Sequence, residues 1–334
     1  MLMTANDNNF WRSAGKPVFS LAPMEDVTDT VFREVVLRMS APGNLGILLT
    51  EFSSVEGLNH PVGRERVAER LVVNESERIL LKQMGVRLVA QIWGIHPEIF
   101  HRVARWITDT YAFDGLDINM GCPVKKVVKM GACSALIAQP DRAAEIVAAV
   151  KEATHLPVSI KTRTGISEHE TEEWIPQLLA MKPAAITIHG RTQRMQSEGL
   201  ASWEEIARAV ALRNQLGVDI PVHGNGDVLS MDQGYQLAET TGVDGIMVGR
   251  GIFHNPWFFD PEKTDVPKTE RIRQLLFHTR LFEQTWKGAK NFSILKRFYK
   301  IYLNSFPGAA QMRADIMDAK SYDEVYRYFE NSCE

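Results

Sequence analysis

The 334-residue sequence has few cysteines and no long apolar segment, and both absences narrow the kind of protein it encodes. Cys122, Cys133 and Cys333 are scattered and odd in number, so they match neither a disulfide framework nor a zinc-binding spacing. The sequence holds no apolar run of about 18 residues or more, which argues against a membrane span. Residues 1–16 are polar and lack the apolar stretch of a signal peptide. We therefore expect a cytoplasmic protein with reduced thiols and no metal.

An excess of positive charge is also missing. The 38 Lys and Arg residues face 41 Asp and Glu residues, which gives a formal net charge of −3. Such a chain can bind nucleic acid only through a local basic surface. Residues 125–129 contain three lysines, and residues 271–300 contain eight basic residues against one acidic residue, Glu283. The second run includes Lys290, Lys296 and Arg297 and three aromatic residues, Trp286, Phe298 and Tyr299. A charge run alone is more often a solvated helix face.

Short apolar segments alternate with amphipathic stretches along most of the chain. We predict strands at residues 18–22, 47–50, 88–92, 115–119, 158–161, 185–189, 220–223 and 245–248. Helices are predicted between them, for instance at 99–110, 142–153 and 203–216, and the polar residues 53–78 form a long excursion. Eight strands that alternate with helices predict an α/β fold, a parallel (β/α)8 TIM barrel, rather than an open sheet.

The pattern changes after Asp260. Residues 261–267 have the composition of a linker, and only helical segments follow, at 271–286, 293–304, 309–317 and 322–331. We therefore predict an N-terminal segment (1–16), a catalytic barrel (17–262) and a smaller all-helical C-terminal domain (268–334).

The most informative motif occupies residues 117–123 and reads Asp-Ile-Asn-Met-Gly-Cys-Pro. Residues two apart on a strand share a face, so Asp117 and Asn119 point the same way. The glycine and proline beside Cys122 favour a tight turn that presents its thiol at the strand end. Alone, Cys122 would more often be a small buried apolar residue. An amide and a thiol at one spot, however, suit a site that holds a planar polar ring.

Polar residues also follow the other predicted strands, at the barrel end where enzymes of this fold place their chemistry. An inward-facing Lys161 is costly to bury without an anion or an acceptor. The glycines beside Arg250 let backbone N–H groups approach a phosphate, and the guanidinium can pair with its oxygens. Gln91 can both donate and accept hydrogen bonds at the edge of a bound ring. For His189 a neutral core histidine is the alternative.

The motif at 117–123 and these strand-end residues resemble those of the tRNA-dihydrouridine synthases, the bacterial FMN-dependent type. The resemblance covers nearly the whole chain, including the turn at residues 306–310. It implies a flavin oxidoreductase that uses NADPH or NADH to reduce the C5–C6 bond of uridines in tRNA. It also implies that the helical domain binds RNA, and we expect a monomer.

The resemblance further assigns roles to single residues. Cys122 would be the catalytic proton donor, and substrate would be bound by Asn119, Arg163 and Arg191. Cys133 would be structural, because the family usually has a small residue there. The cofactor FMN would be held by Pro23, Met24, Glu25, Gln91, Lys161, His189, Asn225, Gly226, Asp227, Gly249 and Arg250.

The sequence departs from the family pattern in residues 191–199, where a tyrosine is missing and the second arginine has moved. This loop is expected to face the substrate, so the departure concerns RNA positioning rather than the cofactor. Two alternatives stay open. One is a flavin barrel that acts on a free small molecule, as a dihydroorotate dehydrogenase does. The other is a non-catalytic RNA-binding barrel.

Overall fold

The computed structural model describes residues 9–13 and 16–332. Cys333 and most of the predicted N-terminal segment lie outside the described residues. Among the described residues, no helix combines the length and the apolar character that crossing a membrane requires. Within the same ranges, no group of three or more His, Cys, Asp or Glu side chains is arranged to hold a metal ion.

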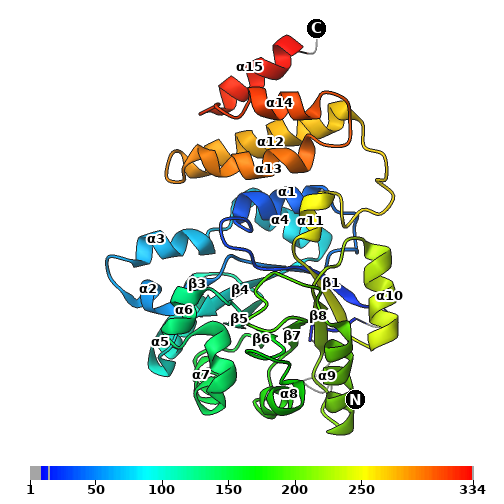
Figure 1. The fold of residues 1–334 in the computed structure, drawn as a ribbon. Helices are drawn as coiled ribbons and strands as arrows, with labels where there is room; N and C mark the ends of the chain where they lie inside the picture. The colour runs from blue at the N-terminus through cyan, green and yellow to red at the C-terminus, as the bar shows by residue number, and fades with distance from the viewer. Residues whose placement is uncertain (1–8, 14–15, 333–334) are drawn as a thin grey trace.

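Eight parallel strands form a closed barrel, which confirms the predicted fold class (Figure 1). Neighbours along the chain pair in parallel, and β1 pairs with both β2 and β9 to close the ring. A two-residue strand, β3 (Ser53–Ser54), extends the sheet beside the end of β4. The barrel strands are β1 (Val18–Leu21), β2 (Ile47–Leu49), β4 (Arg87–Trp93), β5 (Gly115–Met120), β6 (Val158–Arg163), β7 (Ile186–His189), β8 (Val222–Asn225) and β9 (Gly245–Val248).

Strand β8 begins two residues later than predicted. Pro221 has no N–H to donate to a neighbouring strand, and its carbonyl accepts from Ile186 N just before the strand starts. β8 also ends two residues later than predicted, so Asn225 is its last residue. The Asn225 Nδ2 donates to Met247 O of β9 at 2.8 Å.

The longer helices surround the barrel because each buries an apolar face against it. In α5 (Pro97–Thr110) the proline occupies the first turn, where no N–H is needed, and Phe100, Val103, Ala104 and Ile107 form one buried stripe. The remaining helical elements before residue 255 are α1 (Thr30–Arg38), α2 (Val55–Asn59), α3 (Arg64–Ala68), η1 (Glu69–Leu71), α4 (Glu75–Met84), α6 (Lys125–Lys129), η2 (Cys133–Ala138), α7 (Pro140–Ala153), α8 (Thr171–Ala180), α9 (Trp203–Gln215), α10 (Met231–Thr241) and α11 (Gly251–His254).

Trp11 belongs to the small core inside the barrel. It is fully buried and packs with Val18, Ile47 and Val89. Its carbonyl also lies 2.7 Å from Nε2 of the buried His223. Residue 11 is therefore part of the folded barrel, although the sequence indicates only a polar N-terminal segment.

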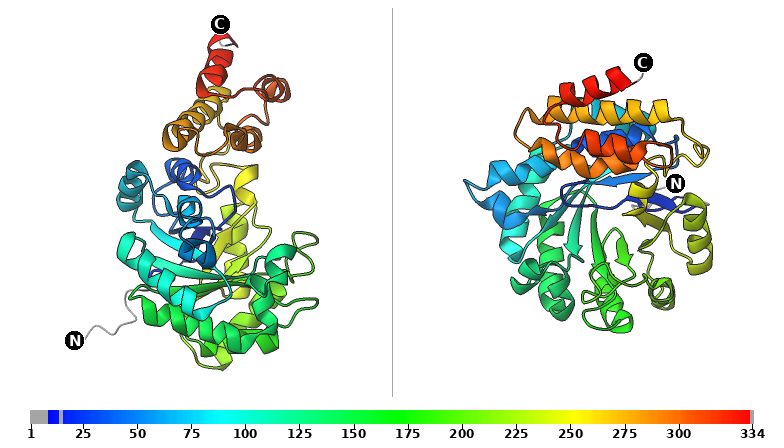
Figure 2. Two further views of the ribbon diagram at one scale, coloured as in Figure 1. Left: turned by 90° about the vertical axis from the view of Figure 1, so that its left-hand side faces the viewer. Right: turned by 45° about the horizontal axis from the view of Figure 1, so that its top comes forward.

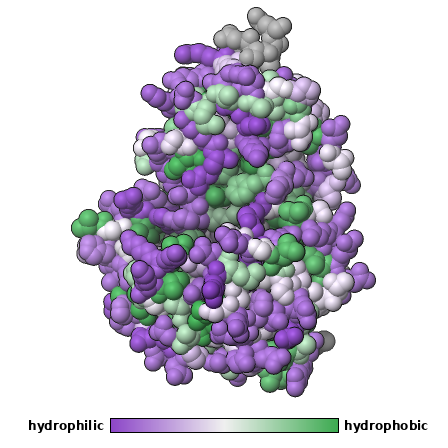
Figure 3. Space-filling view, in the orientation of Figure 1, coloured by the Kyte–Doolittle hydropathy of each residue, from purple (hydrophilic) through white to green (hydrophobic). Residues whose placement is uncertain are grey.

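The C-terminal part is helical and packs on one side of the barrel, over α1 and α11 (Figures 1 and 2). Trp286, Phe298 and Tyr299 are buried there, so these aromatic rings belong to the core and do not supplement a basic surface. Apolar side chains gather in a hollow below this part, while much of the same face is hydrophilic (Figure 3). Its elements are α12 (Lys268–Trp286), η3 (Phe292–Leu295), α13 (Lys296–Tyr302), α14 (Ala309–Asp315) and α15 (Tyr322–Ser332).

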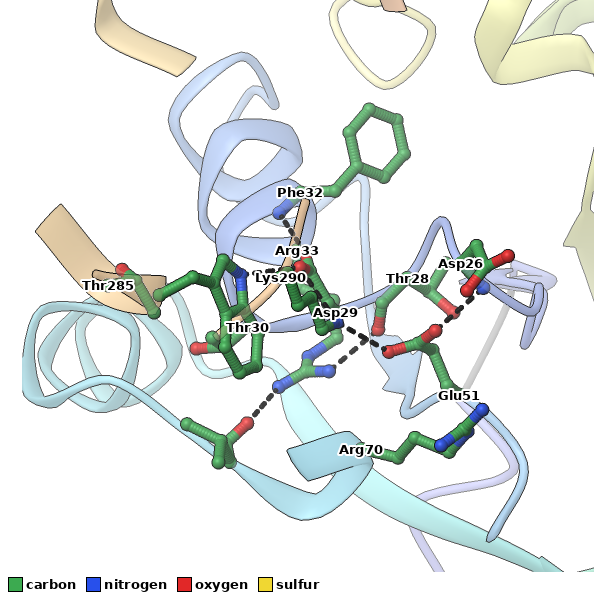
Figure 4. A network of polar contacts seen from close by, with 12 residues as sticks. Asp26, Thr28, Asp29, Thr30, Phe32, Arg33, Glu51, Arg70, Thr285 and Lys290 are labelled. Atoms are coloured by element: carbon green, nitrogen blue, oxygen red, sulfur yellow. Dashed lines mark hydrogen bonds and ion pairs between the residues drawn. The ribbon is translucent and has the colours of Figure 1, made fainter. Parts of the chain in front are cut away.

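A cluster of polar contacts joins this helical part to the barrel (Figure 4). Lys290 Nζ lies 3.3 Å from Asp29 Oδ2 and 3.4 Å from Glu51 Oε2, and it sits 4.0 Å above the ring of Trp286. Trp286 Nε1 donates to the same Asp29 oxygen at 2.9 Å. Lys290, predicted from its charge run as part of a basic surface, is thus a half-buried partner of two carboxylates.

Candidate active site

A cavity of about 530 Å³ lies at the C-terminal ends of the barrel strands, a volume within the usual range for cofactor sites. Glu25 and Gln91 are not among its lining residues. The predicted site residues that do line it are Pro23, Met24, Asn119, Cys122, Lys161, Arg163, His189, Arg191, Asn225, Gly226, Asp227, Gly249 and Arg250.

One wall of the cavity carries more positive than negative charge. Lys161 Nζ donates to Asn225 Oδ1 at 3.1 Å, and burial lowers the pKa of Lys161 to about 8. Burial, together with Lys161 and the nearby arginines, lowers the pKa of His189 far below its ordinary value, so its ring is neutral. Asp227 is the carboxylate among the lining residues. An anionic group bound at this wall would offset the repulsion among the cations.

Asp227 holds two arginines at that wall. Arg191 Nη2 contacts Asp227 Oδ2 at 2.6 Å, and Arg250 Nη2 contacts Asp227 Oδ1 at 3.1 Å. Desolvation opposes ionisation of Asp227, but the hydrogen bonds from Arg191 and the Ala201 backbone and the charges of the two arginines together outweigh it, so the pKa of the carboxyl is lowered. The side chain of Arg250 is 58% exposed, so Arg250 keeps donors available to a ligand, whereas Arg191 is buried.

The two arginines predicted to bind substrate mainly fix loops. Arg163 Nε donates to Gly121 O at 2.7 Å, beside Cys122, and its Nη1 donates to Thr192 O and Gln196 O at 2.8 Å. This guanidinium ties the loop after β5 to the loop after β7. Arg191 Nη2 likewise donates to Gly199 O at 2.7 Å within the loop that departs from the family pattern.

Cys122 is half-buried at the cavity, and its thiol contacts that of Cys133. A hydrogen bond from Cys133 to the Cys122 sulfur, opposed by burial and assisted by the Val124 backbone, lowers the pKa of Cys122 to about 7. Ser134 Oγ donates to Cys122 O at 2.7 Å and fixes the two segments side by side. Cys133, for which the sequence predicts a structural role, thus lies against the Cys122 thiol and is the largest of the contacts that lower its pKa.

Asn119 holds the loop that carries Cys122. Its Oδ1 accepts from the backbone N–H groups of Gly121 and Cys122, both at 3.0 Å. Its Nδ2 donates to Gln91 Oε1 at 2.9 Å, and Gln91 Nε2 donates to Asp117 Oδ2 at 2.7 Å. Gln91 is fully buried and uses both ends of its amide beneath the site.

Glu25 lies in the loop after β1 and forms an ion pair with Arg70. The next residue, Asp26, donates its N–H to Glu51 Oε1 at 2.7 Å. The loop that supplies Met24 to the cavity is therefore fixed by contacts outside it, and one of them reaches the carboxylate that pairs with Lys290.

Some lining residues were missed from the sequence. Phe52 follows β2, and Gln196 and Ser197 lie in the loop after β7. Inspection of the strand ends does not find them, because each lies some residues beyond a strand and is brought back by loop geometry. The further lining residues are Ala22, Gly121, Pro123, Val228, Leu229, Gly251 and His254.

Comparison with known proteins identifies the family. A model of the dihydrouridine synthase (Dus) family matches residues 20–333. The chain is 42% identical over 319 residues to a probable tRNA-dihydrouridine synthase 2 of Bacillus subtilis, covering 95% of this chain and 94% of the relative. It is 40% identical to a probable tRNA-dihydrouridine synthase of Staphylococcus epidermidis, again over 95% of this chain and 94% of the relative.

A solved structure, a 2-naphthoyl-CoA reductase in complex with 2-naphthoyl-CoA, is similar in fold, with a TM-score of 0.52 at 12% identity. That match covers 73% of this chain and 49% of the reductase chain. The extent of the family match and the identity to the two bacterial relatives decide the assignment: the chain belongs to the dihydrouridine synthase family.

Proposed function

We propose that the protein reduces the C5–C6 bond of uridine in tRNA to 5,6-dihydrouridine, with flavin mononucleotide in the cavity and NADPH or NADH as the reductant. The names of the relatives support the tRNA substrate. The observation that carries the proposal is the position of Cys122 and Asn119 at a cavity whose other wall is cationic.

The cationic wall fits the phosphate end of the cofactor. Arg250 keeps free donors, Lys161 and the arginines supply positive potential, and Gly249 leaves the nearby backbone open to close approach. Pro23 and Met24 supply apolar surface for a ring. When bound, the reduced flavin supplies the hydride that is added to C6 of uracil.

Cys122 would deliver the proton to C5. A thiol with a pKa of about 7 is still substantially protonated at neutral pH and can also release its proton readily. Asn119 would keep the loop of Cys122 in place through its Oδ1 and present the second hydrogen of its Nδ2 to the uracil edge. The uridine must leave its stack to reach the cavity, which costs a few kcal/mol.

Cys122→Ala separates the two half-reactions. The variant should bind flavin and be reduced by NADPH at a near-normal rate, because that step needs no thiol. Dihydrouridine formation should fall by about 10²- to 10⁴-fold, because a positioned acid is lost. The measurement is reoxidation of the reduced enzyme by unmodified tRNA. Reoxidation at the wild-type rate would assign the acid to another group.

Flavin retention tests the cofactor site. Arg250→Ala and Lys161→Ala should each purify with less bound flavin, measured from the visible spectrum, because each removes a cation from the wall. A wild-type protein that is colourless and takes up no added flavin would contradict the proposed cofactor.

RNA mass spectrometry on a strain that lacks the gene would name the modified position and separate tRNA from a small-molecule substrate.

We also propose that the helical part (268–334) assists RNA binding and that the enzyme acts as a monomer in the cytoplasm. Lys125, Lys126 and Lys129 on α6 are exposed a few residues after Cys122, and they would meet RNA phosphates around the cavity. Light scattering with and without tRNA tests the monomer.

A further inference from the structure

Asp117 lies at the start of a directed chain of hydrogen bonds that ends at Cys122. Asp117 is fully buried in β5, and Ser159 Oγ donates to its Oδ1 at 2.6 Å. Its other oxygen accepts from Gln91 Nε2 at 2.7 Å. Gln91 Oε1 accepts from Asn119 Nδ2, and Asn119 Oδ1 accepts from the backbone N–H groups of Gly121 and Cys122.

The two ends of this chain fix the orientation of both amides. A carboxylate can only accept, so Gln91 must turn its NH₂ group toward Asp117 and its oxygen toward Asn119. A backbone N–H can only donate, so Asn119 must turn its oxygen toward Cys122. The two requirements agree because each amide donates from its NH₂ group and accepts at its oxygen, so every bond of the chain runs in the same direction. If either amide turned over, two donors or two acceptors would face each other inside a buried site.

We propose that Asp117 is a positioning residue of the enzyme, which orients Gln91 and Asn119 and thereby holds the loop that carries Cys122. The inference rests on the proposed role of Cys122. Asp117 does not line the cavity, so it acts on the loop through the two amides. The role belongs to its acceptor oxygen rather than to its negative charge.

Two kinds of substitution separate the acceptor from the charge. In Asp117→Asn the side-chain carbonyl can still accept from Gln91, while the new NH₂ group can donate to Ser159, whose hydroxyl also accepts. In Asp117→Leu the acceptor is lost at similar side-chain size, and Gln91 is free to turn. Asp117→Val replaces the leucine variant if that one does not fold.

The test measures how firmly the loop that carries Cys122 is held. Amide hydrogen exchange of the peptide that contains Gly121 and Cys122 should be about three- to tenfold faster in Asp117→Leu, because two hydrogen bonds of the loop are weakened. The pH midpoint of Cys122 alkylation by iodoacetamide should shift as well, read by peptide mass spectrometry. Asp117→Asn should match the wild type in both measurements.

The outcomes are distinct. Equal effects of Asn and Leu at residue 117 would assign the role to the charge and overturn the proposal. A leucine variant with wild-type exchange and alkylation would overturn it too. Neither measurement needs flavin or RNA, so the result stands apart from the proposed function. If both measurements behave as expected but tRNA does not reoxidise the wild-type enzyme, the reaction assignment fails and the positioning role remains.

Discussion

At the scale of single residues, Cys133 is the largest of several contacts that lower the pKa of Cys122. Cys133 has a positive φ of 54°, a rare backbone conformation for a residue with a side chain, and its thiol lies against that of Cys122. The sequence shows both cysteines but contains no sign of their contact, because it depends on the path of the chain between them. The motif identified Cys122 as a candidate acid, whereas the acid strength follows from the fold.

Cys133→Ala should therefore raise the pKa of Cys122 from about 7 toward its ordinary value of 9.0. The proposed proton donor is the protonated thiol, which is lost as pH rises through its pKa. Dihydrouridine formation should decline above about pH 7 in the wild type and persist to higher pH in the variant. Alkylation of Cys122 as a function of pH measures the pKa itself.

Cys133→Ser is the matched control, because its hydroxyl keeps a hydrogen-bond donor at the same place. It should leave the pKa of Cys122 closer to the wild-type value than Cys133→Ala does. If alanine and serine at this position give the wild-type midpoint, Cys133 does not set the acidity of Cys122, and its role is packing alone.

At the scale of elements, the alternation of apolar and amphipathic segments was enough to predict the barrel, because its strands and longer helices must bury one side. The contacts between elements were not predictable in this way. Lys287 and Lys290 lie in the same basic run, but Lys287 is exposed at the end of α12 while Lys290 is held between Asp29 and Glu51. Such a difference depends on where α12 meets the barrel.

Lys290→Ala should lower the free energy of unfolding by about 3–5 kcal/mol, because two buried carboxylates lose their cation. Burial raises the pKa of Glu51, and Lys290 lowers it in part. Without Lys290 the pKa of Glu51 rises further. Ionising the buried Glu51 as the pH rises through this pKa then costs more free energy of unfolding in the variant than in the wild type. The loss should therefore be smaller in mildly acidic solution than at neutral pH. Urea denaturation at both pH values measures the difference.

The exposed Lys287 is the control for this prediction. Lys287→Ala should change the free energy of unfolding by no more than about 0.5 kcal/mol at either pH. Equal losses in the two variants would mean that the buried ion pairs contribute nothing beyond a surface charge. A loss in Lys290→Ala that does not vary with pH would exclude Glu51 as its cause.

At the scale of the whole molecule, an acidic chain must offer RNA a local basic surface. The net charge of −3 indicates this requirement without showing where the surface lies. Two of the predicted candidates are engaged in other contacts, since Lys290 pairs with Asp29 and Glu51 and Arg271 donates to Val266 O and Asn304 Oδ1. Arg273, Arg280 and Lys300 stay exposed on the helical part, and the exposed lysines of α6 follow directly on the loop that carries Cys122.

Replacing Lys125, Lys126 and Lys129 by glutamate should weaken tRNA binding and flatten its salt dependence. Each phosphate contact contributes about 0.9 to the slope of log K against log salt for a duplex, so the slope should fall by up to about 2–3. Flavin content should stay at the wild-type level, because these side chains do not line the cavity. Binding titrations at several salt concentrations provide the measurement.

The control makes the same change of net charge at the opposite end of the barrel. Lys82, Arg87 and Lys151 are exposed near the N-terminal ends of the strands or the C-terminal ends of the outer helices, away from the cavity. Glutamate at these three positions alters the overall field equally but removes no cation near Cys122, so the salt slope should stay close to that of the wild type. If both triple variants lose the same affinity and the same slope, tRNA responds to the net charge, and α6 is not its binding surface.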